Sequence, residues 1–133
     1  MSNQINFTFQ DSDWVPPTSY PDLRNAKEIA IDLETKDPDI KTKGPGWPTN
    51  NGNIIGIAVA TDTFKGYYPV AHEAGGNMDM MMTLKWVQDI CRTDALKVFH
   101  NAVYDIGWLR SMGITVYGKV ADTMIAAALI DEN

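Results

Sequence analysis

The stretch IAIDLET, residues 29–35, sets the fold, because its side chains alternate in character along the chain. Three aliphatic residues alternate with three that are small or acidic: Ile29, Ile31 and Leu33 against Ala30, Asp32 and Glu34. Successive side chains of a strand point to opposite faces, so the pattern predicts a strand with one apolar face and one acidic face. The bases of Asp32 and Glu34 would lie roughly 7 Å apart, close enough for both carboxylates to reach one site.

The rest of the chain predicts further strands and then helices that alternate with strands. Strands are expected at 54–60, 64–70, 95–99 and 114–120, and helices at 80–91, 102–112 and 122–130. This order favours the α/β class, with a mixed sheet covered by helices. The segment 36–53, rich in proline and glycine, is a long loop, and such loops are more often functional than idle.

The chain length fits one domain or part of one. Its 133 residues can build one sizeable core but not two. Residues 1–27 are expected to form a lead-in segment that packs by its aromatic side chains, and residues 28–133 the domain proper. Hydrophobic residues make up 44% of the chain and charged residues 21%, which excludes a disordered or low-complexity protein.

Charge and cysteine content exclude several classes of function. Eleven basic against 17 acidic residues give a net charge of −6, so a nucleic-acid partner would need metal cations to offset the carboxylates. The single cysteine, Cys91, excludes an intrachain disulfide and indicates a cytoplasmic protein. The longest apolar runs, 54–60 and 124–130, are far shorter than the roughly 20 residues that span a bilayer, so no membrane association is expected.

A third acid lies in the segment HNAVYDIGWL, residues 100–109. Asn101 is the expected N-cap of the helix, and Asp105 follows four residues later on the same side. The neighbours of Asp105 are apolar, which is unusual for a charge that is merely solvated. Structural alternatives stay open: a solvent-facing edge strand for the first two acids, capping alone for Asn101, and an ion pair with Arg110 or Lys119 for Asp105.

These segments resemble a known family. Residues 29–35 and 100–105 are similar to the first and second motifs of the DEDD 3′-5′ exonucleases. The intervening segment YYPVAHE, residues 67–73, resembles the proofreading domain of family A DNA polymerases, particularly those of bacteriophages. The resemblance runs from about Trp14 to the end of the sequence. His72, just after the strand expected at 64–70, could approach the active site, but a lone histidine without a paired ligand is more often structural.

The resemblance implies an RNase H-like sheet and hydrolysis of DNA from its 3′ end by two divalent ions. Oxygen ligands alone suit Mg²⁺ or Mn²⁺, and two ions roughly 4 Å apart would clamp the attacking and leaving oxygens. By this analogy Asp32 bridges both ions, Glu34 binds the ion that activates water, and Asp105 holds the second. Thr35 and Asn101 contact the 3′ end of single-stranded DNA. The implied partner is the rest of a DNA polymerase chain, in the cytoplasm of a bacterium or phage-infected host.

One departure from the family concerns its third motif, a tyrosine four residues before a fourth aspartate. No Y-x-x-x-D occurs in this sequence, and Tyr117 and Asp122 are five residues apart. Asp122 is instead expected to cap the helix that follows it. We therefore expect an N-terminal fragment or split product with an incomplete metal site and without its C-terminal helices. Its uncovered sheet face would favour self-association or docking to the rest of the chain.

Two alternative functions follow from this departure. One is a catalytically inactive module with an exonuclease-like fold that binds a single-stranded end. The other is an α/β interaction domain whose acids are only surface charges.

Overall fold

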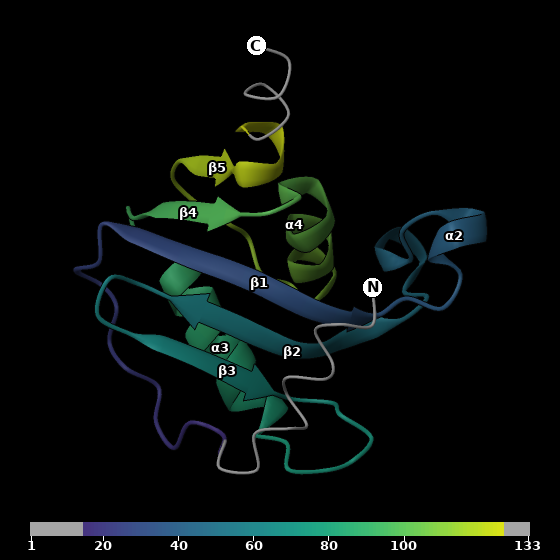
Figure 1. The fold of residues 1–133 in the computed structure, drawn as a ribbon, viewed down its shortest axis with the longest axis horizontal. Helices are drawn as coiled ribbons and strands as arrows, with labels where there is room; N and C mark the ends of the chain where they lie inside the picture. Colours follow the sequence, from purple (N-terminus) through teal and green to yellow (C-terminus); the bar gives the residue numbers. More distant parts are fainter. Residues whose placement is uncertain (1–14, 127–133) are drawn as a thin grey trace.

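The computed structural model describes residues 15–126 and contains one mixed five-stranded sheet (Figure 1). Its strands are β1 (Glu28–Lys36), β2 (Asn53–Ala60), β3 (Lys65–Pro69), β4 (Leu96–Phe99) and β5 (Val120–Asp122). They lie in the order β3-β2-β1-β4-β5. β1 pairs antiparallel with β2, and β2 with β3, whereas β4 lies parallel to β1 and β5 parallel to β4. The mixed sheet predicted from the element order is confirmed.

Two helices of regular length flank the sheet, α3 (Met80–Cys91) and α4 (Ala102–Ser111). The long loop holds two short helical turns, α2 (Ile40–Lys43) and η1 (Trp47–Thr49). Asp79 caps α3, because its Oδ1 accepts a hydrogen bond from the Met82 N–H at 2.9 Å. Such a bond satisfies one of the backbone donors that a helix start leaves unpaired.

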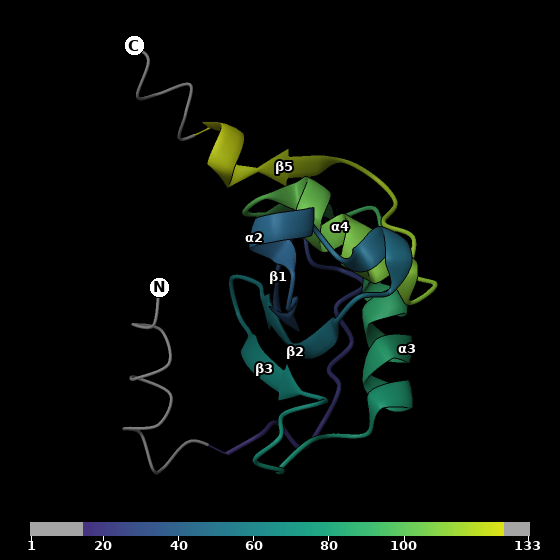
Figure 2. The same cartoon turned by 90° about the vertical axis from the view of Figure 1, so that its right-hand side faces the viewer.

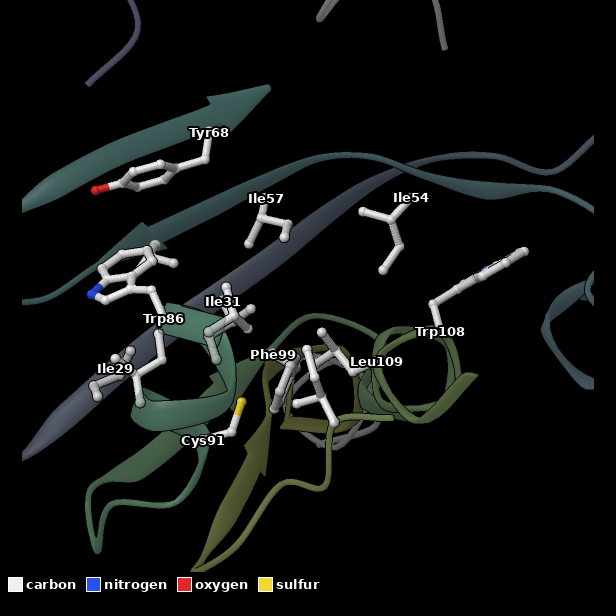
Figure 3. Close-up of a cluster of buried hydrophobic side chains, with 14 of the residues drawn as sticks. Ile29, Ile31, Ile54, Ile57, Tyr68, Trp86, Cys91, Phe99, Trp108 and Leu109 are labelled. Atoms are coloured by element: carbon white, nitrogen blue, oxygen red, sulfur yellow. The ribbon is translucent and has the colours of Figure 1, made fainter. Parts of the chain in front are cut away.

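The apolar face of β1 and both helices form the core. Figure 2 shows α3 against one face of the sheet. In Figure 3, Trp86 and Cys91 of α3 and Trp108 and Leu109 of α4 converge on the isoleucines of β1 and β2. Ile29 and Ile31 are 0% and 2% exposed, as their alternation predicts. Each such side chain contributes roughly 1.5–3 kcal/mol by leaving water.

The opposite face of the sheet carries the acids and small side chains, and α3 lies on the other side of the sheet (Figure 2). A hollow of about 660 Å³ lies over this face, with the lining residues Ala30, Asp32, Ala58, Ala60, Tyr67, Val98 and His100 among others. We call this surface the open face. Three alanines, Ala30, Ala58 and Ala60, contribute small side chains to its lining.

The lead-in segment packs onto the core through Tyr20. Its ring stacks on Tyr68 at 5.4 Å and lies 5.6 Å from the Trp86 ring, and its hydroxyl hydrogen-bonds the Thr83 hydroxyl at 2.8 Å. The expected packing by aromatic side chains therefore holds for this residue. The aromatic residues among 1–14 lie outside the described part, and the domain boundary at residue 28 remains a prediction.

Two elements differ from the sequence-based expectations. The strand expected at 114–120 is wrong, because the strand occupies only Val120–Asp122. Ile114 is 2% exposed and the Tyr117 N–H donates to the Cys91 carbonyl, so this segment joins the core without pairing in the sheet. Gly118, at φ +80°, interrupts the extended backbone before the strand begins.

The helix expected at 122–130 starts at residue 123, and its course beyond residue 126 lies outside the described residues. Within residues 15–126, no helix combines the length and the apolar composition that crossing a bilayer requires.

Candidate active site

Asp32 lies in the middle of β1 on the open face. Its side chain contacts solvent, yet the surrounding protein removes enough water to raise the pKa of Asp32. The nearby His100 ring and the Leu33 N–H act in the opposite direction, and the negative charge of Glu34 raises the pKa further. Asp32 is thus a carboxylate whose surroundings disfavour its charge.

Asp105 is the buried acid of the site, with only 3% of its surface exposed. Burial raises its pKa to about 7, and the charge of Asp32 adds to the rise, while the backbone N–H of Leu33 lowers it. Its Oδ2 atom has no hydrogen-bond partner among the described residues. A buried carboxylate oxygen without a partner, next to a second carboxylate, is a position that a cation would stabilise.

None of the ion pairs formed within residues 15–126 includes Asp105. The structural alternative of an ion pair with Arg110 or Lys119 is therefore wrong for the described residues. Asp105 lies on the face of α4 that also carries the buried Ala102, Trp108 and Leu109, at spacings of three and four residues, so this face places the carboxylate in an interior position.

Glu34 lies two residues beyond Asp32 on the same face, and its carboxylate is held by two aromatic side chains. The Tyr67 hydroxyl donates to Glu34 Oε1 at 2.8 Å, and His72 Nε2 lies 2.6 Å from the same hydroxyl and 4.0 Å from Oε1. Burial and the bond to Glu34 raise the pKa of Tyr67, so its hydroxyl keeps its proton.

The three predicted acids are thus only partly brought together. Asp32 is coupled electrostatically to both Asp105 and Glu34. Yet within residues 15–126 no set of three or more His, Cys, Asp or Glu side chains has a geometry that would hold a metal ion. The assignment of all three as ligands therefore remains a prediction.

The start of α4 differs from the expectation. Asn101 occupies the N-cap position, but its backbone is left-handed at φ 72° and its side chain forms no capping bond. Asp122 of β5 takes that role: its two oxygens accept the N–H groups of Asn101 at 2.9 Å and Ala102 at 2.8 Å. N-cap side chains normally reach the helix from an extended backbone, which explains why Asn101 cannot.

Asp122 also caps its own segment, as predicted, by accepting the Met124 N–H at 2.9 Å. The hydrogen bond from the Ala102 N–H, together with those from Asn101 and Met124, lowers the pKa of Asp122. These backbone hydrogen bonds therefore account for the presence of the Asp122 carboxylate near the site.

Of the predicted contacts to the nucleic-acid end, Thr35 lies near the end of β1 and Asn101 directly precedes α4. The Thr35 hydroxyl hydrogen-bonds the Tyr104 hydroxyl at 2.8 Å, and Tyr104 donates to Asp37 Oδ2 at 2.9 Å. This chain of bonds connects the end of β1 to α4 and to the long loop. The Asn101 side chain is not used for capping, which leaves it available to a ligand.

Carboxylate oxygens are the donors that Mg²⁺ and Mn²⁺ prefer, and the unpartnered Asp105 Oδ2 beside Asp32 fits such an ion. Tyr67 and His100 are the site neighbours that the sequence reasoning did not assign, and His72, favoured there as structural, lies beside Tyr67 and Glu34. Tyr67 follows the same alternation as the acids, on the strand paired with β2, but only the hairpin register brings it to them.

Solved structures share this fold. NrnC of Brucella melitensis superposes with a TM-score of 0.54 at 20% identity, covering 82% of this chain and 48% of that one. The same protein with bound Mg²⁺ gives a TM-score of 0.51, and a second structure, described as the apo form of the nuclease, gives 0.53 at 21% identity. The mixed five-stranded sheet with its flanking helices is therefore an RNase H-like fold. The sequence model for the 3′-5′ exonuclease domain of family A DNA polymerases matches residues 20–133, and the chain belongs to that family.

Relatives by sequence are DNA polymerases of phages and bacteria. The DNA-directed DNA polymerase of Pseudomonas phage M6 is 40% identical over 118 residues, which cover 81% of this chain and 17% of the relative. DNA polymerase I of Borreliella burgdorferi is 29% identical over 112 residues, covering 84% of this chain and 11% of the relative. The chain spans less than a fifth of the length of these relatives.

Proposed function

We propose that this chain supplies Asp32, Glu34 and Asp105 to a two-metal 3′-5′ exonuclease site that hydrolyses DNA during proofreading. One observation carries the proposal. The buried Asp105 carboxylate has an oxygen without a hydrogen-bond partner, and it lies beside Asp32, whose negative charge is also disfavoured by its surroundings. Relatives named as DNA polymerases support DNA as the substrate and a polymerase chain as the partner. The Mg²⁺ in a structural neighbour supports Mg²⁺ or Mn²⁺ as the cofactor.

The residues divide the work by position. Divalent cations, when bound, would neutralise the phosphate charge and activate water for attack. Asp32 and Asp105 would bind the cations, and Glu34 would add a third carboxylate from the next position of β1 on the open face. Thr35 and Asn101 contact the 3′ end, which fixes the terminal nucleotide against β1 and the start of α4.

The test is cation-dependent binding of a DNA end. A labelled single-stranded oligonucleotide with a 3′-hydroxyl should bind the chain more tightly in Mn²⁺ than in EDTA, and Asp32→Ala and Asp105→Ala should each abolish that difference. Exchange of the 3′-hydroxyl for a 3′-phosphate controls for recognition of the end. Equal binding with and without Mn²⁺, or binding that both variants leave unchanged, would refute the proposal.

Turnover by the chain should be slow. The family's Tyr-x-x-x-Asp motif is missing from the sequence, and loss of one electrostatic or positioning element typically costs about 10²–10³ in rate. Degradation at the rate of an ordinary exonuclease, stopped by Asp32→Ala, would show that the fourth acid lies within this sequence, and Asp122 would be the next residue to substitute.

A second candidate is an inactive module that binds a single-stranded end. It is favoured by the lack of a three-ligand metal geometry within residues 15–126. It predicts binding of a single-stranded end with no turnover at any Mn²⁺ concentration. The interaction-domain alternative, in which all three acids are surface charges, disagrees with the 3% exposure of Asp105 and predicts no effect of divalent ions on the melting temperature.

Two further expectations concern the cellular location of the protein and its binding partners. Its phage and bacterial relatives support a cytoplasmic location in a bacterium or infected host. The open face, with its apolar floor, supports self-association or docking to the rest of a polymerase chain. Analytical ultracentrifugation of the chain tests self-association, and a chain that stays monomeric at all concentrations would refute it.

A further inference from the structure

Glu34 is held more firmly than its exposure suggests. Its side chain is 51% exposed, and a glutamate in that position normally samples several rotamers. Here the Tyr67 hydroxyl donates to its Oε1 at 2.8 Å. The bond occupies Oε1 and does not involve the second carboxylate oxygen, Oε2.

The sheet register shows that this contact requires a residue without a side chain on β2, the strand between Tyr67 and Glu34. Tyr67 pairs with Ala58, which pairs with Asp32, whereas Glu34 pairs with Gly56, two residues before Ala58 on β2. The Tyr67 side chain therefore crosses β2 diagonally to reach Glu34. A Cβ atom on Gly56 would lie 1.7 Å from the Tyr67 hydroxyl oxygen and 2.2 Å from its Cζ, so only glycine leaves room for the crossing.

His72 holds the tyrosine from the other side. Its Nε2 lies 2.6 Å from the Tyr67 hydroxyl, and the two rings meet edge to face with centroids 5.8 Å apart. A phenol has one proton, and the Glu34 carboxylate accepts it, so the bond to His72 uses an Nε2–H that donates to the Tyr67 oxygen.

Asn77 fixes His72 in turn. Its side chain accepts the His72 N–H at 2.7 Å and donates to the His72 carbonyl at 2.9 Å. The hydrogen bonds therefore run from the loop after β3, through two ring side chains, to a carboxylate on β1.

We propose that Tyr67 and His72 are positioning residues for Glu34, which hold its Oε1 so that Oε2 is presented as a single oxygen donor to a divalent cation shared with Asp32. The inference rests on the proposed function, which makes Glu34 a ligand. Hydrogen-bond partners of ligating side chains commonly change metal affinity 10–100-fold. The loss of the Tyr67 hydroxyl should therefore weaken Mn²⁺ binding about tenfold.

The experiment measures the Mn²⁺ dissociation constant of the 133-residue chain from the electron paramagnetic resonance signal of free Mn²⁺. Tyr67→Phe and Gly56→Ala should each weaken binding about tenfold, the second by displacing an intact tyrosine. Tyr68→Phe is the matched control, because that neighbouring residue on β3 points into the core and its hydroxyl donates to the Ser19 carbonyl. Its affinity for Mn²⁺ should equal that of the wild type.

Rescue distinguishes positioning from a merely structural role. His72→Gln keeps an N–H donor near the Nε2 position and should retain most of the affinity, whereas His72→Leu should lose several-fold. Affinities of Tyr67→Phe and Gly56→Ala equal to or tighter than that of the wild type would overturn the inference. Should one of the two variants fail to unfold cooperatively, the affinity of the other decides.

The two proposals fail in different ways. If the wild-type chain binds no Mn²⁺, or Asp32→Ala leaves its binding unchanged, the proposed function falls and the positioning role falls with it. If Asp32→Ala abolishes binding and the Tyr67 and Gly56 variants bind like the wild type, only the positioning role is refuted.

Discussion

Asp105→Asn should make the protein more stable at neutral and alkaline pH, although it removes a candidate catalytic acid. Folding raises the pKa of Asp105 from 3.8 to about 7, mainly through burial. Three pKa units correspond to about 4 kcal/mol of differential interaction between the two protonation states. The asparagine keeps the shape of the side chain and cannot ionise, so this penalty disappears.

The sign follows from proton uptake. Between about pH 4 and about pH 7 the folded protein holds a proton on Asp105 that the unfolded chain has released, so the free energy of unfolding falls as the pH rises. Below this range both states are protonated and the group contributes nothing. Above it both are ionised and the folded state bears the full cost. The raised pKa of Asp32 acts in the same direction.

The assay is urea unfolding followed by tryptophan fluorescence in EDTA, from about pH 5 to about pH 8. The wild type should lose about 3 kcal/mol across this range, and Asp105→Asn should remove most of that loss. Asp62→Asn, which removes an exposed carboxylate between β2 and β3, is the matched control and should leave the pH dependence as it is in the wild type. Equal pH slopes for the wild type and Asp105→Asn would refute the reasoning.

Three further predictions concern metal binding, capping and packing. At ten times its dissociation constant, in the millimolar range typical of a weak carboxylate site, Mg²⁺ should stabilise the wild type by about 1.4 kcal/mol, and a melting curve of Asp32→Ala should show no shift. Asp122→Ala should lower the melting temperature, because it removes the acceptor for the first N–H groups of α4. For the same reason the stability of the wild type should fall in acid, as the Asp122 carboxylate, whose pKa is lowered in the folded protein, becomes protonated. Gly107→Ala should cost roughly 1–3 kcal/mol in urea unfolding, because the new Cβ would lie 2.3 Å from Trp47 Cε2.

Each of these has a contrary outcome. Mg²⁺ stabilisation that survives Asp32→Ala would place the ion elsewhere. A melting temperature of Asp122→Ala equal to that of the wild type would mean that water replaces the cap without cost. An unchanged unfolding free energy for Gly107→Ala would show that the loop carrying Trp47 moves aside freely.

Local patterns predicted much of the fold. The alternation in residues 29–35 identified both the buried and the acidic face of β1, because a strand's two faces follow directly from its period of two. The cap of α3 is also a local contact, because the Met82 N–H donates to the Asp79 side chain only three residues before it. The buried position of Asp105 was indicated by its apolar neighbours.

Contacts between distant segments were not predictable from local patterns. Asp122 replaces Asn101 as the cap of α4 across about 20 residues of sequence, and only the pairing of β5 with β4 brings it there. The Tyr67–Glu34 bond depends on the hairpin register and on the missing side chain at Gly56. Both contacts lie at the candidate site, where long-range geometry, and not the period of any one element, decides which side chains meet.

Because Asp122 caps both α4 and its own helical turn, the site depends on β5, an edge strand of the described sheet. β5 contains only three residues, and its Asp122 carboxylate bonds the backbone where α4 begins, four residues before Asp105. Short edge strands open locally more readily than central ones. Each opening of β5 would release the N–H groups of Asn101 and Ala102 to solvent, so the hydrogen-exchange rates of these two amides report directly how often the turn that carries the buried acid comes undone.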